Sequence, residues 1–262
     1  MTVSADTLAT IALAAGKEIM RVYRTDFSVS HKDDKSILTE ADGLAEAIIL
    51  KGLAEAEPDL KVIAEEAVAG GHIPQHGTRF ALVDPLDGTK EFVARNGEFT
   101  VNIAIIENGR PVMGVVYAPA LNRLFVAESP SSAWQAEAAP DGPVPAKRSP
   151  LKVRPSPSEG LTAVASKSHR SPETEEWLAR YPIAEIKGAG SSLKFCLVAA
   201  GEADVYPRHG RTMEWDTAAG QAVVEAAGGR VLTMDGNSLL YGKRERGYDN
   251  PHFVVFGDVT PV

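Results

Sequence analysis

The sequence has little of what several classes of protein require. A single cysteine, Cys196, occurs among 262 residues, which excludes an internal disulfide framework and favours a reducing compartment. No apolar run approaches the ~20 residues that cross a bilayer, and the first residues lack the basic-then-apolar order of a secretory signal. We therefore expect a cytoplasmic protein, with peripheral association at the inner face of the membrane as an alternative location.

Positive charge is also scarce. The 27 lysines and arginines are outnumbered by 35 acidic residues, which gives a formal net charge of −8. This balance disfavours binding to nucleic-acid polymers, but it allows a small phosphorylated ligand if metal ions offset the acidic groups. The 44% hydrophobic content is enough for a real core in one large or two modest domains.

Hydrophobic periodicity predicts alternating helices and strands, and hence an α/β fold. Helices are expected at 4–24, 40–53, 171–180, 191–200 and 215–227. Strands are expected at 60–64, 80–83, 99–106, 111–117, 121–127, 161–165, 183–186, 203–206, 231–232 and 253–256. Residues 129–160 contain seven prolines and read as a linker. The prediction is an N-terminal α+β lobe at 1–135 and a C-terminal α/β lobe at 150–262.

The segment Asp84-Pro85-Leu86-Asp87-Gly88-Thr89 carries the strongest chemical signal. An apolar strand delivers two carboxylates, the proline holds Asp84 extended, and Gly88 permits a tight reversal before a helix. Amides at that helix start could hold a phosphate, and oxygen ligands suit Mg²⁺. A turn with a helix cap is the structural alternative.

Three further acids are expected at the ends of elements. Glu65 follows a strand, Asp42 has capping-box spacing from Thr39, and Asp216 opens a helix. Asp42 and Asp216 could be helix-terminal acids only, but convergence of all these acids in one crevice would suit two metal ions ~3.5–4 Å apart that activate a water. The chain lacks the Gly-rich loop of a P-loop kinase and the Asp-x-Asp order of an aspartyl-phosphate phosphatase.

Three of these segments together resemble a known family. D-P-L-D-G-T at 84–89, E-E at 65–66 and W-D-T-A-A-G at 215–220 resemble the signature regions of the inositol monophosphatase superfamily of lithium-sensitive, Mg²⁺-dependent phosphatases. Longer strings at 84–92, 95–104, 114–119, 190–199 and 206–208 resemble its branch of CysQ-type 3′(2′),5′-bisphosphate nucleotidases. This similarity covers nearly the whole chain.

The resemblance implies a two-lobed αβαβα sandwich of the inositol monophosphatase and fructose-1,6-bisphosphatase type, with two or three Mg²⁺ ions per site. The metal ligands it implies are Glu65, Asp84, the Leu86 carbonyl, Asp87 and Asp216. The catalytic residues it implies are Asp42, Glu65 and Thr89, which would position or deprotonate a water. The substrate contacts it implies are Gly88, Thr89, His169, Ser191, Lys194 and Arg208.

The activity implied is hydrolysis of the 3′-phosphate of adenosine 3′,5′-bisphosphate to AMP and phosphate in sulfur assimilation, without a covalent intermediate. An inositol or sugar phosphatase remains an alternative, as does a nucleotide sensor without catalysis. Taken without the family, His169 is a surface or cap residue, and Lys194 and Arg208 are solvated cations. Arg211 stands where close relatives often have proline, and it adds positive charge near the expected pocket.

Overall fold

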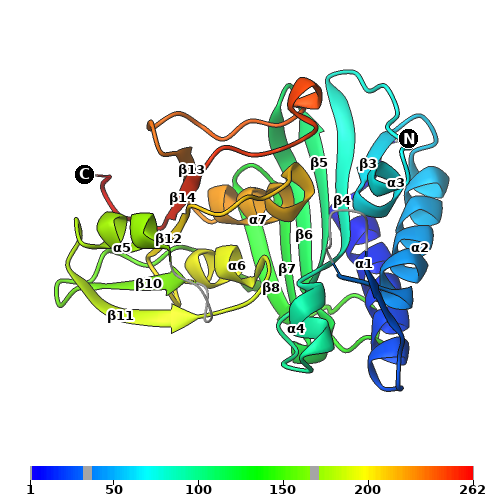
Figure 1. Cartoon of the computed structure of the whole chain (residues 1–262), viewed down its shortest axis with the longest axis horizontal. Coiled ribbons are helices and arrows are strands. Elements are labelled where there is room, and N and C mark those ends of the chain that lie inside the picture. Colours follow the sequence, from blue (N-terminus) through cyan, green and yellow to red (C-terminus); the bar gives the residue numbers. More distant parts are fainter. Residues whose placement is uncertain (1, 32–36, 166–170, 262) are drawn as a thin grey trace.

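Two mixed β-sheets separated by a pair of helices form the frame of the molecule (Figure 1). The computed structural model describes residues 2–31, 37–165 and 171–261. Helices α1 (Ala5–Tyr23) and α2 (Glu40–Ala56) cover the outer face of the larger sheet. Helices α6 (Leu193–Ala199) and α7 (Glu214–Ala226) lie between the sheets, and α5 (Pro172–Leu178) covers the far face of the smaller one. The predicted αβαβα sandwich is confirmed.

Within the described residues, the larger sheet has seven strands and the smaller has five. In spatial order the larger contains β3 (Lys61–Ala64), β4 (Arg79–Asp87), β5 (Thr100–Glu107), β6 (Arg110–Ala118), β7 (Arg123–Ser129), β8 (Ser132–Glu137) and β9 (Ser149–Pro150). The smaller contains β11 (Ile183–Gly188), β10 (Leu161–Ala165), β12 (Val205–Arg208), β14 (Phe253–Phe256) and β13 (Arg230–Thr233). Short elements complete the chain: β1 (Val29–His31), β2 (Ile37–Thr39), α3 (Glu65–Ala69), α4 (Thr89–Val93), η1 (Pro119–Leu121) and η2 (Arg244–Arg246).

Strand β5 reads as a continuous apolar run because helices cover both of its faces. Ile103 and Ile105 belong to the core cluster under α1 and α2, whereas Ala104 and Ile106 face the α7 side. The strand then turns into β6 through Asn108 and Gly109, which have φ of 50° and 76°. These left-handed values are those of a tight hairpin turn, as the sequence predicts.

Helix α7 approaches the larger sheet very closely at Gly114 of β6. A Cβ added at Gly114 would lie 2.8 Å from the Cβ of Ala222 and 2.9 Å from the carbonyl oxygen of Ala219. Glycine on the strand and alanines on the helix therefore allow this contact. One core cluster runs from Leu82 of β4 through the helices to Phe253 of β14, so the two sheets share a hydrophobic core.

The linker predicted at 129–160 is wrong, because part of this segment belongs to the larger sheet. Strand β8 pairs with β7, and Trp134 within it is buried beneath the Arg148 guanidinium, 4.2 Å from the ring centroid. Leu151 and Val153 are buried as well. The prolines obscured a short apolar strand. The division into lobes at 1–135 and 150–262 stays a prediction, although residue 135 falls inside β8.

Cys196 lies on α6 and is fully buried, as the sequence predicts. Burial raises the pKa of its thiol well above the usual range, so the reactive thiolate is strongly disfavoured. We expect the native protein to react with a thiol-specific chromogenic disulfide reagent far more slowly than the denatured protein. Reaction at equal rates in buffer and in denaturant would contradict this burial.

No helix in the described ranges is long and apolar enough to span a bilayer.

Candidate active site

Asp84 and Asp87 share one face of β4 because the strand carries a bulge between them. Asp84 is opposite Asn102 of β5, and Asp87 is opposite Thr100, so three steps along β4 match two along β5. Thr100 and Asn102 share a face because side chains alternate along a strand, and the bulge therefore puts both carboxylates on that face, toward α7. The strand does not end before the acids as predicted; it continues to Asp87.

Gly88 then redirects the chain into α4. Its φ of 92° and ψ of 43° are left-handed values that glycine adopts without strain. Thr89 begins the helix, and its hydroxyl oxygen lies 3.5 Å from both Asp42 Oδ1 and the Leu86 carbonyl oxygen. The sequence prediction that Asp42 orients Thr89 is therefore compatible with the geometry.

Asp42 also caps α2. Its Oδ2 accepts from the Thr39 backbone N–H at 2.8 Å and from the Thr39 hydroxyl at 2.7 Å. Only 2% of Asp42 is exposed. The capping bonds and the contact with Thr89 use different oxygens, so the capping role does not exclude a role for Asp42 in orienting Thr89.

Asp84, Asp87, Asp216 and Glu65 form one electrostatic cluster drawn from three elements. Burial raises the pKa of Asp84 well above its usual value, and the charges of Glu65, Asp87 and Asp216 raise it further. Burial and the charge of Asp87 likewise raise the pKa of Asp216. Asp216 lies in the first turn of α7, where its carboxylate accepts the Met213 N–H at 2.7 Å. Glu65 begins α3.

The donor chemistry of this cluster fits a hard divalent cation. Its groups are carboxylates and the neighbouring Leu86 carbonyl, which are ligands that Mg²⁺ prefers. Among the described residues, no three His, Cys, Asp or Glu side chains surround one point as closely as metal ligands do. Burial and mutual repulsion raise the pKa values of Asp84 and Asp216, so nearby positive charge would favour their ionised forms.

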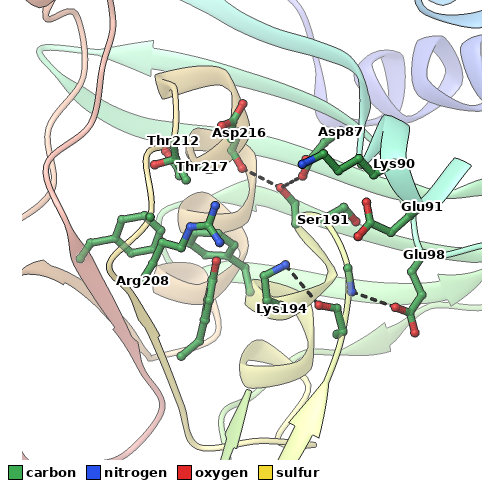
Figure 2. Close-up of a pocket in the computed structure, with 18 of the residues that line it drawn as sticks. Asp87, Lys90, Glu91, Glu98, Ser191, Lys194, Arg208, Thr212, Asp216 and Thr217 are labelled. Carbon is green, nitrogen blue, oxygen red and sulfur yellow. Dashed lines mark hydrogen bonds between the residues drawn. The ribbon is translucent and has the colours of Figure 1, made fainter. Parts of the chain in front are cut away.

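A cavity of about 560 Å³ opens beside the cluster (Figure 2). Asp87 and Asp216 lie at one end, and Lys194 and Arg208 lie on the other side. Lys194 is 7% exposed, with its ammonium 5.6 Å from the Tyr206 ring centroid. Burial lowers the pKa of Lys194 to about 8, against the attraction of Asp87. The solvated lysine that spacing alone suggests is thus wrong, whereas Arg208 is partly exposed.

Two neighbouring serines line this cavity in different ways. Ser191, which the sequence singled out, has a left-handed φ of 44°, and its hydroxyl oxygen is buried without a partner among the described residues. Ser192 was not singled out, yet its Oγ lies 2.9 Å from Asp87 Oδ2. The cavity is also lined by Glu91 and Glu98, which sequence reasoning missed.

His169 and Arg211 were also expected in or near the pocket. His169 lies outside the described residues. Arg211 does not line the cavity, and its Nε donates to Asp249 Oδ1 at 2.8 Å. Its charge is therefore partly offset, and the expected change in the pocket's charge is small.

The fold, the carboxylate cluster and the cavity are those expected of a metal-dependent phosphatase. Residues 3–253 match the model of the inositol monophosphatase family. The chain belongs to this family. Within it, the chain is 44% identical over 252 residues to the Escherichia coli 3′(2′),5′-bisphosphate nucleotidase CysQ, covering 95% of this chain and 98% of the relative.

Solved structures agree with this placement. The crystal structure of CysQ from Bacteroides thetaiotaomicron, a bacterial member of the same family, matches 98% of this chain and 97% of its own with a TM-score of 0.82 and 38% identity. An IMPase from Thermotoga maritima matches 95% of this chain and 89% of its own with a TM-score of 0.73 and 27% identity. By both TM-score and identity, the chain is therefore more similar to this CysQ than to this IMPase.

Proposed function

We propose that this protein is a 3′(2′),5′-bisphosphate nucleotidase that hydrolyses adenosine 3′,5′-bisphosphate to AMP and phosphate. The observation that carries the proposal is a cavity with Asp87 and Asp216 of the carboxylate cluster on one side and Lys194 and Arg208 on the other (Figure 2). A substrate with two phosphates needs two such places: one where a P–O bond breaks and one where charge is only held. The 44% identity to a nucleotidase of this name supports the same substrate class.

The carboxylates of Glu65, Asp84, Asp87 and Asp216 and the Leu86 carbonyl are the groups that would hold two or three Mg²⁺ ions. When bound, Mg²⁺ supplies positive charge that acidifies a water and stabilises the leaving oxygen. This chemistry fits the cluster, because burial and the charges of neighbouring carboxylates raise the pKa values of Asp84 and Asp216.

Thr89 and Asp42 would place the attacking water. Asp42 Oδ2 is saturated by Thr39, which leaves Oδ1 directed at the Thr89 hydroxyl. The hydroxyl is then held to accept from or donate to a water in line with the 3′-phosphate, assisted by Glu65. The bond from phosphorus to the 3′-oxygen breaks as the water oxygen bonds to phosphorus. The water gives up a proton and the leaving 3′-oxygen takes one up to become the 3′-hydroxyl of AMP, so no phosphoenzyme forms. The amides of Gly88 and Thr89 would hold the phosphate being cleaved.

Lys194 and Arg208 would hold the second phosphate, with Ser191 beside them. Arginine and lysine both form charge-assisted hydrogen bonds with phosphate oxygens. The Nε of Arg208 is buried without a partner among the described residues, which leaves a donor for such an anion. His169 remains part of the proposed nucleotide contacts by resemblance alone.

The test is phosphate release with Mg²⁺ from equal concentrations of adenosine 3′,5′-bisphosphate, AMP, inositol 1-phosphate and fructose 1,6-bisphosphate. We expect a strong preference for the first. Preference for an inositol or sugar phosphate would overturn the substrate but keep the metal chemistry. Tight binding of the bisphosphate without turnover would indicate a sensor.

The lowered pKa of Lys194 gives this substrate a pH signature. The ammonium is charged below pH about 8 and loses its proton above it, so attraction for the second phosphate falls as pH rises. Substrate phosphates are already dianions there, because their second pKa is about 6. We expect kcat/KM for the bisphosphate to fall above pH about 8.

Lys194→Arg is the matched control for this pH signature, because arginine stays charged throughout the range. In that variant the fall above pH about 8 should disappear, while adenosine 3′-monophosphate, which lacks the second phosphate, should show little of it in either protein. A fall of equal size in Lys194→Arg would remove Lys194 from the explanation.

A further inference from the structure

Ser192 joins the two parts of the carboxylate cluster that come from different layers of the fold. Its Oγ lies 2.9 Å from Asp87 Oδ2, on β4 of the larger sheet, and 2.6 Å from the Asp216 carbonyl oxygen, on α7. A third neighbour is Asn102 of β5, whose Nδ2 lies 2.9 Å from the same oxygen. Ser192 is 1% exposed, so water does not compete for these bonds.

The direction of each hydrogen bond in this network follows from which groups can donate. The Asn102 amide nitrogen can only donate, so it occupies a lone pair of Ser192 Oγ. The hydroxyl's one proton must then go to an acceptor, and the two acceptors in reach are the Asp87 carboxylate and the Asp216 carbonyl. The bond from Asn102 thus orients the Ser192 hydroxyl so that its proton points toward Asp87 and Asp216, the proposed metal ligands.

The hydroxyl is diverted from its usual helix role. Ser192 occupies the N-cap position of α6, where serine commonly accepts an N–H of its own helix. It makes no such side-chain cap bond here. Local helix stability therefore does not account for this serine, whereas the contacts with Asp87 and Asp216 do.

We propose that Ser192, oriented by Asn102, is a positioning residue that fixes the spacing between the strand-borne Asp87 and the helix-borne Asp216. This inference rests on the proposed function, since both acids are proposed as Mg²⁺ ligands. Groups that hydrogen-bond a metal ligand commonly change metal affinity by about 10- to 100-fold. The expected defect of Ser192→Ala is thus weaker Mg²⁺ binding in a folded protein.

Thr100 supplies a matched control. It faces Asp87 across the bulge, is fully buried, and its hydroxyl has no partner among the described residues. Thr100→Val removes a buried hydroxyl beside the same carboxylate without breaking a bond, so Mg²⁺ affinity should not change. Comparing Ser192→Ala with Thr100→Val therefore distinguishes the loss of a hydrogen bond to Asp87 from the loss of a nearby polar group.

The experiment is calorimetric titration of each variant with Mg²⁺, without substrate, together with melting temperatures in chelator. We expect Ser192→Ala to raise the Mg²⁺ dissociation constant by about 10- to 100-fold, with Ser192→Thr restoring most of the affinity. Asn102→Ala should weaken binding too, and adding it to Ser192→Ala should cause no further loss, because the two residues act through one network.

An affinity of Ser192→Ala equal to that of the parent, or an equal defect in Thr100→Val, would overturn the proposal. If Ser192→Ala does not fold, Asn102→Ala decides, and unchanged affinity there rejects the positioning role. A parent protein that binds no Mg²⁺ would defeat the metal assignment of the proposed function as well. Turnover of a different substrate with normal Mg²⁺ binding would leave the positioning role intact.

Discussion

Replacement of Asp87 by asparagine will slow phosphate release by about 10²- to 10³-fold, because metal charge is worth several kcal/mol in the transition state and each ~1.4 kcal/mol is tenfold in rate. Asparagine keeps the size of the side chain and an oxygen that can accept from Ser192. It loses only the negative charge. Steady-state kinetics at saturating Mg²⁺, with melting temperature as the folding check, measure the effect.

Glu91→Gln is the control for this experiment. Glu91 lines the same cavity, and its charge acts on Asp87, but it is not proposed to bind metal. Its loss should change the rate by less than about tenfold, since such indirect charge effects amount to ~1 kcal/mol. Near-normal activity of Asp87→Asn would defeat the ligand assignment, and an equal loss in Glu91→Gln would make the effect one of general charge.

Arg208→Ala will lower kcat/KM for adenosine 3′,5′-bisphosphate by about 10- to 100-fold, the cost of ~1.5–3 kcal/mol for a hydrogen bond to a charged group. Use of a substrate that has the 3′-phosphate alone, adenosine 3′-monophosphate, should fall much less. The reason is position: Arg208 lines the cavity apart from Asp87, so it can reach a second phosphate (Figure 2). Kinetics with both substrates measure the ratio.

Arg211→Ala is the matched control for Arg208. It removes an arginine three residues away that pairs with Asp249 and does not line the cavity. The Arg208 side chain donates to the backbone carbonyl of Arg211, which the substitution keeps. Equal losses on both substrates in Arg208→Ala, or the same selectivity change in Arg211→Ala, would remove Arg208 from specificity.

Much of the fold could be predicted from sequence because local chemistry and global packing agree. The Thr39–Asp42 capping box and the Asn108-Gly109 turn both form as their spacing predicts. The bulge in β4 could not be predicted, because it depends on register with β5. Strand β8 was hidden by prolines on both sides of a short apolar segment.

Roles for individual site residues could be predicted only from the resemblance to the inositol monophosphatase superfamily. Gly88, Ser191, Lys194 and Arg208 line the cavity together with Asp87 and Asp216, whereas Thr89 contacts Asp42 and the Leu86 carbonyl. The roles of all these residues remain proposals. Ser192 was missed because two adjacent serines look alike in sequence. The left-handed backbone of Ser191 decides which serine faces Asp87, and nothing in the amino-acid type signals that conformation outside glycine and asparagine.

Helix α7 packs in the core between the two sheets and also contains Asp216. Its closest approach to the sheet is at Gly114, where a single added methyl group has no room beside Ala219 and Ala222. A larger residue there must push the helix outward, and Asp216 would move with it. The distance between α7 and the larger sheet therefore also sets the position of Asp216 in the site. Evolution can therefore adjust catalysis through buried residues that never meet the substrate.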